Sequence, residues 1–161
     1  MRKIGFLGVV IEPNGIKMEK EKVNGVLSWP EPKNVKDVRK FLGLTNYYRR
    51  FIKDFAQVAR PINMLMRKDV KWQWGVEQQK AFDKLKRVFT TKPVLAVLDL
   101  DKEFRVEADV SNYATEGVLS IKCSDEMWRP VTFISKSLSD TERNYKIHDK
   151  EILAVVRCLE V

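Results

Sequence analysis

The spacing of apolar residues changes once along the chain, near Pro93, and this change limits the possible folds more than any other feature. Before it, apolar side chains recur mainly at helical spacing, and after it they alternate as in β-strands. The predicted helices span residues 19–29, 34–55, 59–66, 76–89 and 149–160, and the predicted strands after the change span 94–98, 104–108, 117–121 and 130–134. The pattern predicts an α+β fold with a domain boundary near residue 93.

A hairpin precedes the first predicted helix. Residues 4–10 are predicted to form a strand, Asn14-Gly15 is a strong turn signal, and residues 16–18 are the predicted return strand. In the long helical stretch that follows, Asn34 is a suitable N-cap. Gly43 lies in the middle of this stretch and predicts a kink or a close helix contact there, or a division into two helices.

Charge divides at the same place as periodicity. Residues 1–97 contain 21 Lys and Arg against 9 Asp and Glu, whereas residues 98–161 contain 9 against 13. A basic half of this kind fits a polyanionic partner, of which nucleic acid is the commonest. The alternative is a solvated, lysine-rich helical surface with no such partner.

Several protein classes are excluded by composition. No run approaches the ~18–20 consecutive apolar residues of a membrane span, and the short apolar stretch 4–11 does not resemble a secretory signal. The two cysteines, Cys123 and Cys158, form neither a disulfide framework nor a zinc motif. We therefore expect an intracellular protein, of the cytoplasm or nucleus, without a membrane partner.

Two carboxylates are candidates for a metal site. Asp109 follows the predicted strand 104–108, and a carboxylate at a strand end can hold a divalent cation. Glu151 begins the last helix and points toward the sheet if Ile152 and Val155 pack on it. Such a pair suits metal-assisted phosphodiester hydrolysis. The alternative is that Asp109 is a turn residue that ends its strand, and that Glu151 offsets the helix dipole.

Basic and aromatic residues interleave in the sequence Tyr47-Tyr48-Arg49-Arg50-Phe51. Tyr48 and Phe51 fall on the apolar side of the predicted helix, so we expect them in the core. Arg49, Arg50 and the nearby Lys53 are then free to reach phosphate oxygens.

Nearly the whole chain resembles the reverse transcriptases of gypsy-type LTR retrotransposons and retroviruses. Phe6-Leu7-Gly8 with Asn14-Gly15-Ile16 resembles the end of the palm, and WPEP at 29–32 with VRKFLGLTNYYRRFI at 38–52 resembles the thumb. FDKLK at 82–86 and PVL at 93–95 resemble the passage into ribonuclease H. The resemblance continues through ADVS at 108–111, GVL at 117–119, PVTFISKSL at 130–138, ERNY at 142–145 and KEILAVV at 150–156.

The resemblance implies roles for individual residues. Asp109 and Glu151 match two metal-binding carboxylates of the ribonuclease H site, where the family uses Mg²⁺ to cut the RNA strand of an RNA–DNA hybrid. The hairpin of residues 6–16 resembles the primer grip. The thumb-like region implies contacts with the nucleic-acid backbone by Arg39, Lys40, Arg49, Arg50 and Lys53. The implied domains are an end-of-palm hairpin (1–18), a helical thumb-like and connecting region (19–92) and a truncated ribonuclease H-like domain (93–161).

The chain also departs from the family pattern. The polymerase aspartates and two further ribonuclease H carboxylates of the family have no counterpart in it, and Val110 replaces a small residue beside Asp109. Glu116 stands where the family tends to have glycine, so an extra carboxylate lies in the sequence near the metal site. Both changes suit a decayed copy, and the chain resembles an excised or degenerate piece of a polyprotein.

We therefore expect a helical half followed by an incomplete, mixed ribonuclease H-like sheet with one helix. The expected function is residual binding of RNA–DNA hybrid or DNA, with weak or absent Mg²⁺ binding and an inactive isolated chain. The uncovered sheet edge and helix face predict self-association. The alternative function is that of a degenerate or domesticated fragment that acts as a protein-interaction module.

Overall fold

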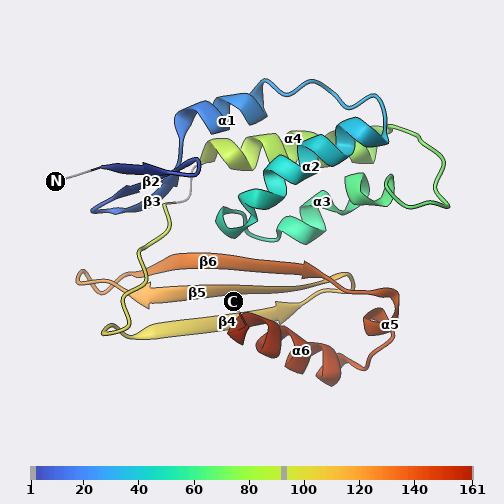
Figure 1. Ribbon diagram of the computed structural model, residues 1–161. Helices are drawn as coiled ribbons and strands as arrows, with labels where there is room; N and C mark the ends of the chain where they lie inside the picture. The colour runs from blue at the N-terminus through green and yellow to red at the C-terminus, as the bar shows by residue number, and fades with distance from the viewer. Residues whose placement is uncertain (1–2, 92–93, 161) are drawn as a thin grey trace.

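The computed structural model describes residues 3–91 and 94–160, and confirms the α+β fold. A helical layer, with a small sheet at one end, lies on one face of a second, longer sheet (Figure 1). The last helix covers the other face of the longer sheet, which is therefore enclosed between two helical layers.

The small sheet is antiparallel and contains β1 (Ile4–Phe6), β2 (Val9–Glu12) and β3 (Gly15–Met18) in that order. The prediction of one strand over 4–10 is wrong, because a tight turn at Leu7 and Gly8 divides it into β1 and β2. Both turn residues have positive φ, +49° and +82°, as a two-residue type I′ hairpin turn requires. The second turn consists of Pro13 and Asn14, one residue before the predicted Asn14-Gly15, because Gly15 already pairs with Glu12 as the first residue of β3.

The helical layer consists of α1 (Lys20–Leu27), α2 (Val35–Tyr47), the 3₁₀ turn η1 (Arg49–Phe51), α3 (Phe55–Met64) and α4 (Val76–Thr91). α2 begins as predicted, since the Asp37 N–H donates to the Asn34 side chain (3.0 Å). It continues through Gly43, where a Cβ atom would meet no other part of the molecule within 4 Å, so the long stretch divides only at η1. The buried aromatic residues Phe41, Tyr48, Phe51, Phe82 and Phe89 form the centre of this core.

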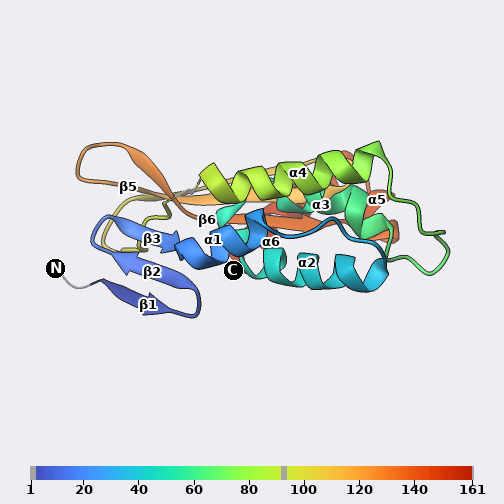
Figure 2. The same cartoon turned by 90° about the horizontal axis from the view of Figure 1, so that it is seen from above.

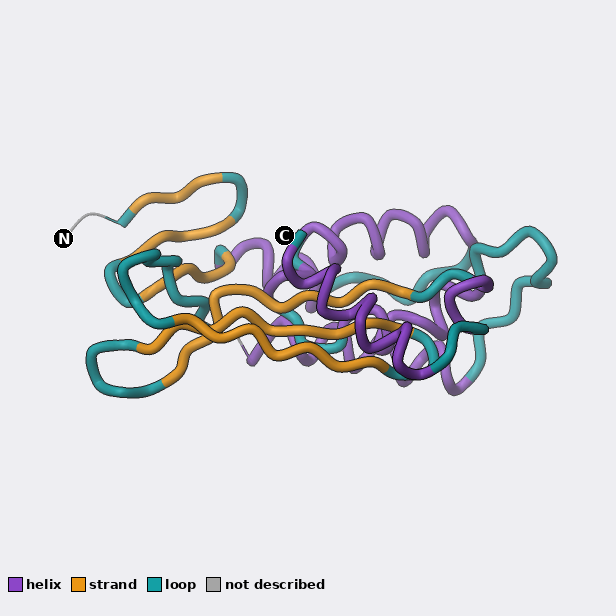
Figure 3. The backbone as a smooth tube through the Cα atoms, turned by 90° about the horizontal axis from the view of Figure 1, so that it is seen from below, coloured by secondary structure: helices purple, strands orange, loops and turns teal. Residues whose placement is uncertain are grey.

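The longer sheet contains β4 (Phe104–Val110), β5 (Ala114–Lys122) and β6 (Trp128–Ser137), paired antiparallel in sequence order. The short α5 (Asp140–Arg143) and then α6 (Ile147–Leu159) follow it. Seen from below, α6 crosses the strands on the face opposite the helical layer (Figure 3). The three strands and the last helix lie where the periodicity predicts them, although each begins or ends a few residues from the predicted position.

The predicted strand 94–98 is not part of the longer sheet. Leu95 forms a single bridge to Ile16 of β3, with N–H···O distances of 2.7 and 3.0 Å. The next residue, Ala96, donates its N–H to the carbonyl of Pro130 in β6 (2.7 Å). This segment therefore joins the two sheets, because its backbone groups pair with one sheet and then with the other. The predicted domain boundary at residue 93 lies outside the described residues.

Successive residues of β5 face different layers of the molecule. Thr115 accepts a hydrogen bond from Arg157 of α6 (3.2 Å), and Gly117 packs against Cys158 of the same helix. Glu116 lies between them in the sequence, so its side chain points to the helical layer. Its partner in β6, Ser135, confirms this direction, since the Ser135 hydroxyl accepts from the Ala56 N–H of α3 (2.7 Å).

Candidate metal and nucleic-acid site

Asp109 and Glu116 occupy opposite positions in the antiparallel pair β4–β5. Directly opposed residues of such a pair lie on the same face of the sheet, so both side chains are on the face of the helical layer. Asp109 is exposed near the end of β4, and its Oδ1 accepts the N–H of Val110 (2.8 Å). The predicted metal ligand is therefore next to a second carboxylate on the same surface.

Glu116 is a buried carboxylate, with 8% of the residue exposed. Neither of its carboxyl oxygens has a hydrogen-bond partner among the described residues. Burial, with smaller contributions from the charges of Asp54 and Asp109, raises the pKa of Glu116 to about 7. The nearby Ser135 hydroxyl and the ammonium group of Lys53 lower this pKa in part, although the Ser135 hydroxyl does not reach hydrogen-bonding geometry with either oxygen.

A cavity of about 220 Å³ lies in front of these two carboxylates. Lys53 and Asp54, from the turn between η1 and α3, form its other side. Asp54 has a φ of +56°, and this left-handed conformation lies where the chain turns into α3. No sequence signal points to Asp54, because its proximity to Asp109 arises only from the packing of the helical layer on the sheet.

Glu151 lies on the other side of the sheet. It is exposed on α6, where its carboxylate is 3.8 Å from Nδ1 of His148. The helix packs on the sheet through Ala154 and Cys158, rather than through the predicted Ile152 and Val155, which are exposed. Small side chains allow the close approach of helix and sheet that larger ones would prevent.

The candidate ligands can be assessed for Mg²⁺ from the residues themselves. Within residues 3–91 and 94–160, no group of three or more His, Cys, Asp or Glu side chains is placed to hold a metal ion. Mg²⁺ keeps much of its hydration shell and needs only one or two carboxylates, which Asp109 and Glu116 supply. The pairing of Asp109 with Glu151 as catalytic ligands stays a prediction.

All five basic residues predicted to contact nucleic acid are exposed. Arg39 and Lys40 lie on α2, Arg49 and Arg50 form η1 with Phe51, and Lys53 follows at the cavity in front of Asp109. Arg49 and Arg50 also line a groove of about 750 Å³ between the helical layer and β6, together with Lys136, which no sequence signal indicates. The basic surface defined by Arg49, Arg50 and Lys53 therefore adjoins the carboxylates.

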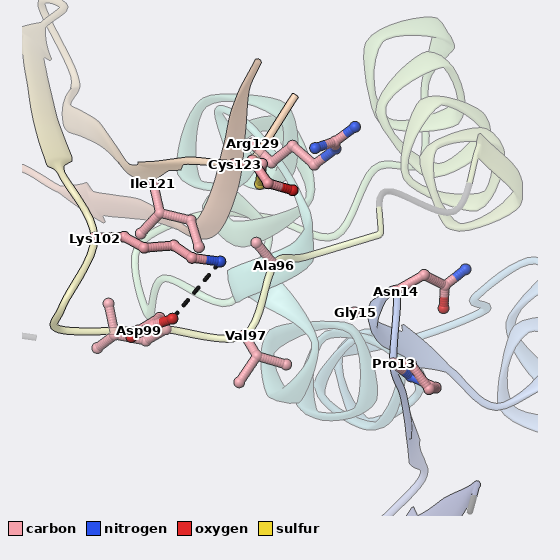
Figure 4. Close-up of a pocket in the computed structure, with 12 residues that line it drawn as sticks. Pro13, Asn14, Gly15, Ala96, Val97, Asp99, Lys102, Ile121, Cys123 and Arg129 are labelled. Carbon is pink, nitrogen blue, oxygen red and sulfur yellow. Dashed lines mark ion pairs between the residues drawn. The ribbon is translucent and has the colours of Figure 1, made fainter. Parts of the chain in front are cut away.

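Another cavity, of about 570 Å³, lies away from these residues (Figure 4). Pro13, Asn14 and Gly15, around the β2–β3 turn, form one side. Ile121, Cys123 and Arg129, from the β5–β6 hairpin, form another. Asp99 and Lys102 form an ion pair of 3.6 Å at its rim. Since Ile121 and Glu116 lie at different ends of β5, this cavity is separate from the carboxylate site.

Residues 74–161 match the family described as "RNase H-like domain found in reverse transcriptase". The Tf2-3 and Tf2-4 transposon polyproteins of Schizosaccharomyces pombe are each 37% identical to the chain over 158 residues. These 158 residues are 98% of the chain, but only 12% of the length of each polyprotein.

The fold is also found in foamy viral protease-reverse transcriptases. One, described in complex with double-stranded DNA, has a TM-score of 0.84 at 18% identity, over 99% of this chain and 28% of that protein. Another, described in complex with RNA/DNA hybrid, has a TM-score of 0.82 at 19% identity, over 98% and 21%. Together with the family match over more than half of the chain, these likenesses confirm the resemblance inferred from the motifs. The chain therefore belongs to the family of RNase H-like domains found in reverse transcriptase.

Proposed function

We propose that this retrotransposon reverse transcriptase/ribonuclease H-like chain binds RNA–DNA hybrid or DNA through the basic surface of η1 and the turn that follows it. The observation that carries the proposal is the position of Arg49, Arg50 and Lys53, which are exposed together beside the Asp109 cavity. In this arrangement, phosphates held by the arginines would lie near the carboxylates.

The charge of this surface is available to a ligand. Within the described part of the chain, none of Arg39, Lys40, Arg49, Arg50 or Lys53 has a carboxylate within ion-pair distance, 4.0 Å. Arginine and lysine side chains of this kind neutralise phosphates and release their counterions, which supplies most of the affinity of sequence-independent binding. The descriptions of the two foamy viral structures, as complexes with DNA and with hybrid, support the same class of ligand.

A binding measurement with a matched control tests the proposal. We expect the chain to bind a fluorescently labelled RNA–DNA hybrid at low salt, and Arg49→Ala with Arg50→Ala to weaken this binding. The control is Lys84→Ala with Arg87→Ala, which removes the same charge from exposed positions on α4. α4 lies along the opposite long side of the helical layer from α2 (Figure 2), so we expect the control to retain its affinity. Equal losses in the two double variants would mean that only net charge matters.

The carboxylates would supply part of a ribonuclease H site. We propose that Asp109 acts as a metal-binding carboxylate as the family resemblance implies, with Mg²⁺ providing charge stabilisation at the scissile phosphate. The resemblance implies the same role for Glu151, but Glu151 lies on the opposite face of the sheet, so the two carboxylates do not converge on one cation in this structure. The arginines of η1 would hold the hybrid backbone, and Asp109 would present its free carboxylate oxygen toward the cation. We expect this chain alone to show little or no cleavage.

A second function is a protein-interaction module. The exposed apolar side chains of α6 favour it. They are Ile147, Ile152, Val155, Val156 and Leu159. Contiguous apolar surface commonly marks an interaction site. The hybrid-binding measurement separates the two functions, because a chain that serves only as an interaction module would not bind nucleic acid even at low salt.

Among the described residues, no helix is long and apolar enough to cross a membrane.

A further inference from the structure

We propose that Asp109 and Glu116 together hold one divalent cation of the Mg²⁺ and Mn²⁺ class, in the cavity between the β4–β5 pair and the η1–α3 turn. The ligands would be carboxylate oxygens from two neighbouring strands, with water completing the coordination. The site does not use Glu151, and therefore differs from the pair that the sequence predicts.

The strand register brings the two carboxylates to a suitable separation. Directly opposed residues of an antiparallel pair have Cβ atoms about 4.5–5.5 Å apart, and Asp109 and Glu116 are such a pair. Mg²⁺–oxygen distances are about 2.0–2.1 Å. One carboxylate from each side chain can thus reach the same cation while both backbones stay in the sheet.

The state of Glu116 is the independent evidence for a ligand. A buried carboxylate normally has hydrogen-bond or charge partners, because an isolated one is expensive to remove from water. Glu116 is 8% exposed, lines the cavity, and has no hydrogen-bond partner at either oxygen among the described residues. A cation in this cavity would satisfy both oxygens at once.

The cavity has room for a hydrated cation. Its volume is about 220 Å³, and one water molecule takes about 30 Å³ of liquid volume. Mg²⁺ usually keeps several waters when proteins bind it through one or two carboxylates. Two protein ligands with a few waters therefore fit this space.

The main alternative is that Lys53, rather than a metal ion, neutralises Glu116, and the charges around the cavity allow this to be tested. Asp54 adds negative charge, whereas Lys53 adds positive charge and is the only cationic side chain among the described residues that line the cavity. If Lys53 is the true counterion of Glu116, its removal would not create a cation site. If the site takes a metal ion, removing Lys53 should strengthen metal binding, because the repulsion between the two cations disappears.

The experiment is a Mn²⁺ titration of the full chain without nucleic acid, in which free Mn²⁺ is followed by electron paramagnetic resonance. Loss of a residue that only hydrogen-bonds to a metal ligand already lowers metal affinity about 10–100-fold. We therefore expect Glu116→Gln and Asp109→Asn, which remove ligands themselves, each to weaken binding at least ~10-fold. Glu31→Gln, at an exposed position between α1 and α2, is the matched control and should bind Mn²⁺ as the unchanged chain does. Lys53→Met should bind Mn²⁺ more tightly.

Thermal unfolding gives a second readout that does not depend on stoichiometry. A cation that binds only the folded state raises the Tm. Mn²⁺ should raise the Tm of the unchanged chain and of Glu31→Gln, but not that of Glu116→Gln, whose circular dichroism would verify folding. The proposal is overturned if Glu116→Gln folds and binds Mn²⁺ as tightly as the unchanged chain, or if Glu31→Gln loses binding to the same extent as Glu116→Gln.

Discussion

Gly117 of β5 lies so close to Cys158 of α6 that any side chain at position 117 would overlap Sγ of the cysteine. The carbonyl oxygen of Glu107, in β4, would be 3.2 Å from the same added Cβ. Glycine at this position therefore determines how closely α6 can approach the sheet. The helix carries Glu151, so the same contact also sets the position of that carboxylate.

Gly117→Ala should destabilise the chain by about 1–3 kcal/mol, because overpacking forces a helix or strand to shift. Urea unfolding measures the loss. Adding Cys158→Ala should restore part of it, since the atom that clashes is Sγ, and a coupling energy between the two sites would show this directly. Gly43→Ala is the control, because Gly43 lies in α2 with open space around it. It should raise stability by up to about 1 kcal/mol.

Stability should fall as the pH rises from about 4.5 to about 7, because of Glu116. Its pKa is about 7 in the folded chain against an ordinary value of 4.5, so the folded state holds the proton more tightly than the unfolded state. The penalty for ionising Glu116 is absent below 4.5, grows between the two pKa values and is complete above 7, where it reaches up to about 3 kcal/mol. Burial is the main cause of this raised pKa; of the groups that face the carboxyl, Asp54 and Asp109 also raise it, whereas Ser135 and Lys53 lower it.

Urea unfolding at pH 5 and pH 8, in EDTA, measures this dependence. Glu116→Gln should remove the fall in stability, since its amide does not ionise, whereas Glu31→Gln, at an exposed position, should leave it unchanged. An equal pH dependence in Glu116→Gln and the unchanged chain would mean that other groups cause it.

The chain should associate with itself at tens of micromolar. β4 is an edge strand of the longer sheet, and α6 exposes Ile152, Val156 and Leu159. Exposed strand edges and apolar helix faces favour pairing between copies. Sedimentation should show a concentration-dependent dimer or larger species. Ile152→Lys with Val156→Lys should shift it to monomer, and a strictly monomeric unchanged chain would show that neither surface drives association.

Ribonuclease H activity should be very weak or absent in the 161-residue chain alone. Two-metal cleavage needs two cations about 3.5–4 Å apart, and Asp109 with Glu116 can hold only one. The test is a labelled RNA–DNA hybrid incubated with Mg²⁺ or Mn²⁺, with Asp109→Asn as the comparison. Cleavage by the unchanged chain that Asp109→Asn abolishes would contradict this expectation, and would mean that other residues complete the site.

Much of the fold is predictable because local signals agree with the tertiary structure. The cap at Asn34 and the three strands of the longer sheet follow from spacing and capping chemistry. The hairpin between β2 and β3 also follows from the Asn14-Gly15 signal, although its turn falls one residue earlier, at Pro13-Asn14. The prediction for residues 94–98 is wrong because a short apolar run has the same period whether it forms a strand or a single bridge. The break at Leu7 is not predictable from its own residue type, because leucine rarely adopts positive φ.

The site is predictable only in part. Asp109 and the exposed basic residues can be found from their sequence neighbours and the resemblance, and Glu116 stands out as an unusual residue. Its burial, and its proximity to Lys53 and Asp54, depend on how the helical layer packs on the sheet. No local pattern records a contact between residues so far apart in the chain.

The salt dependence of hybrid affinity tests the central claim, that Arg49 and Arg50 contact the nucleic-acid backbone. Each phosphate contact contributes about −0.9 to the slope of log K against log salt. We predict that Arg49→Ala with Arg50→Ala flattens this slope by up to about two units, while Lys84→Ala with Arg87→Ala leaves it unchanged. An unchanged slope in the Arg49 and Arg50 double variant would contradict the account and remove these residues from the binding surface.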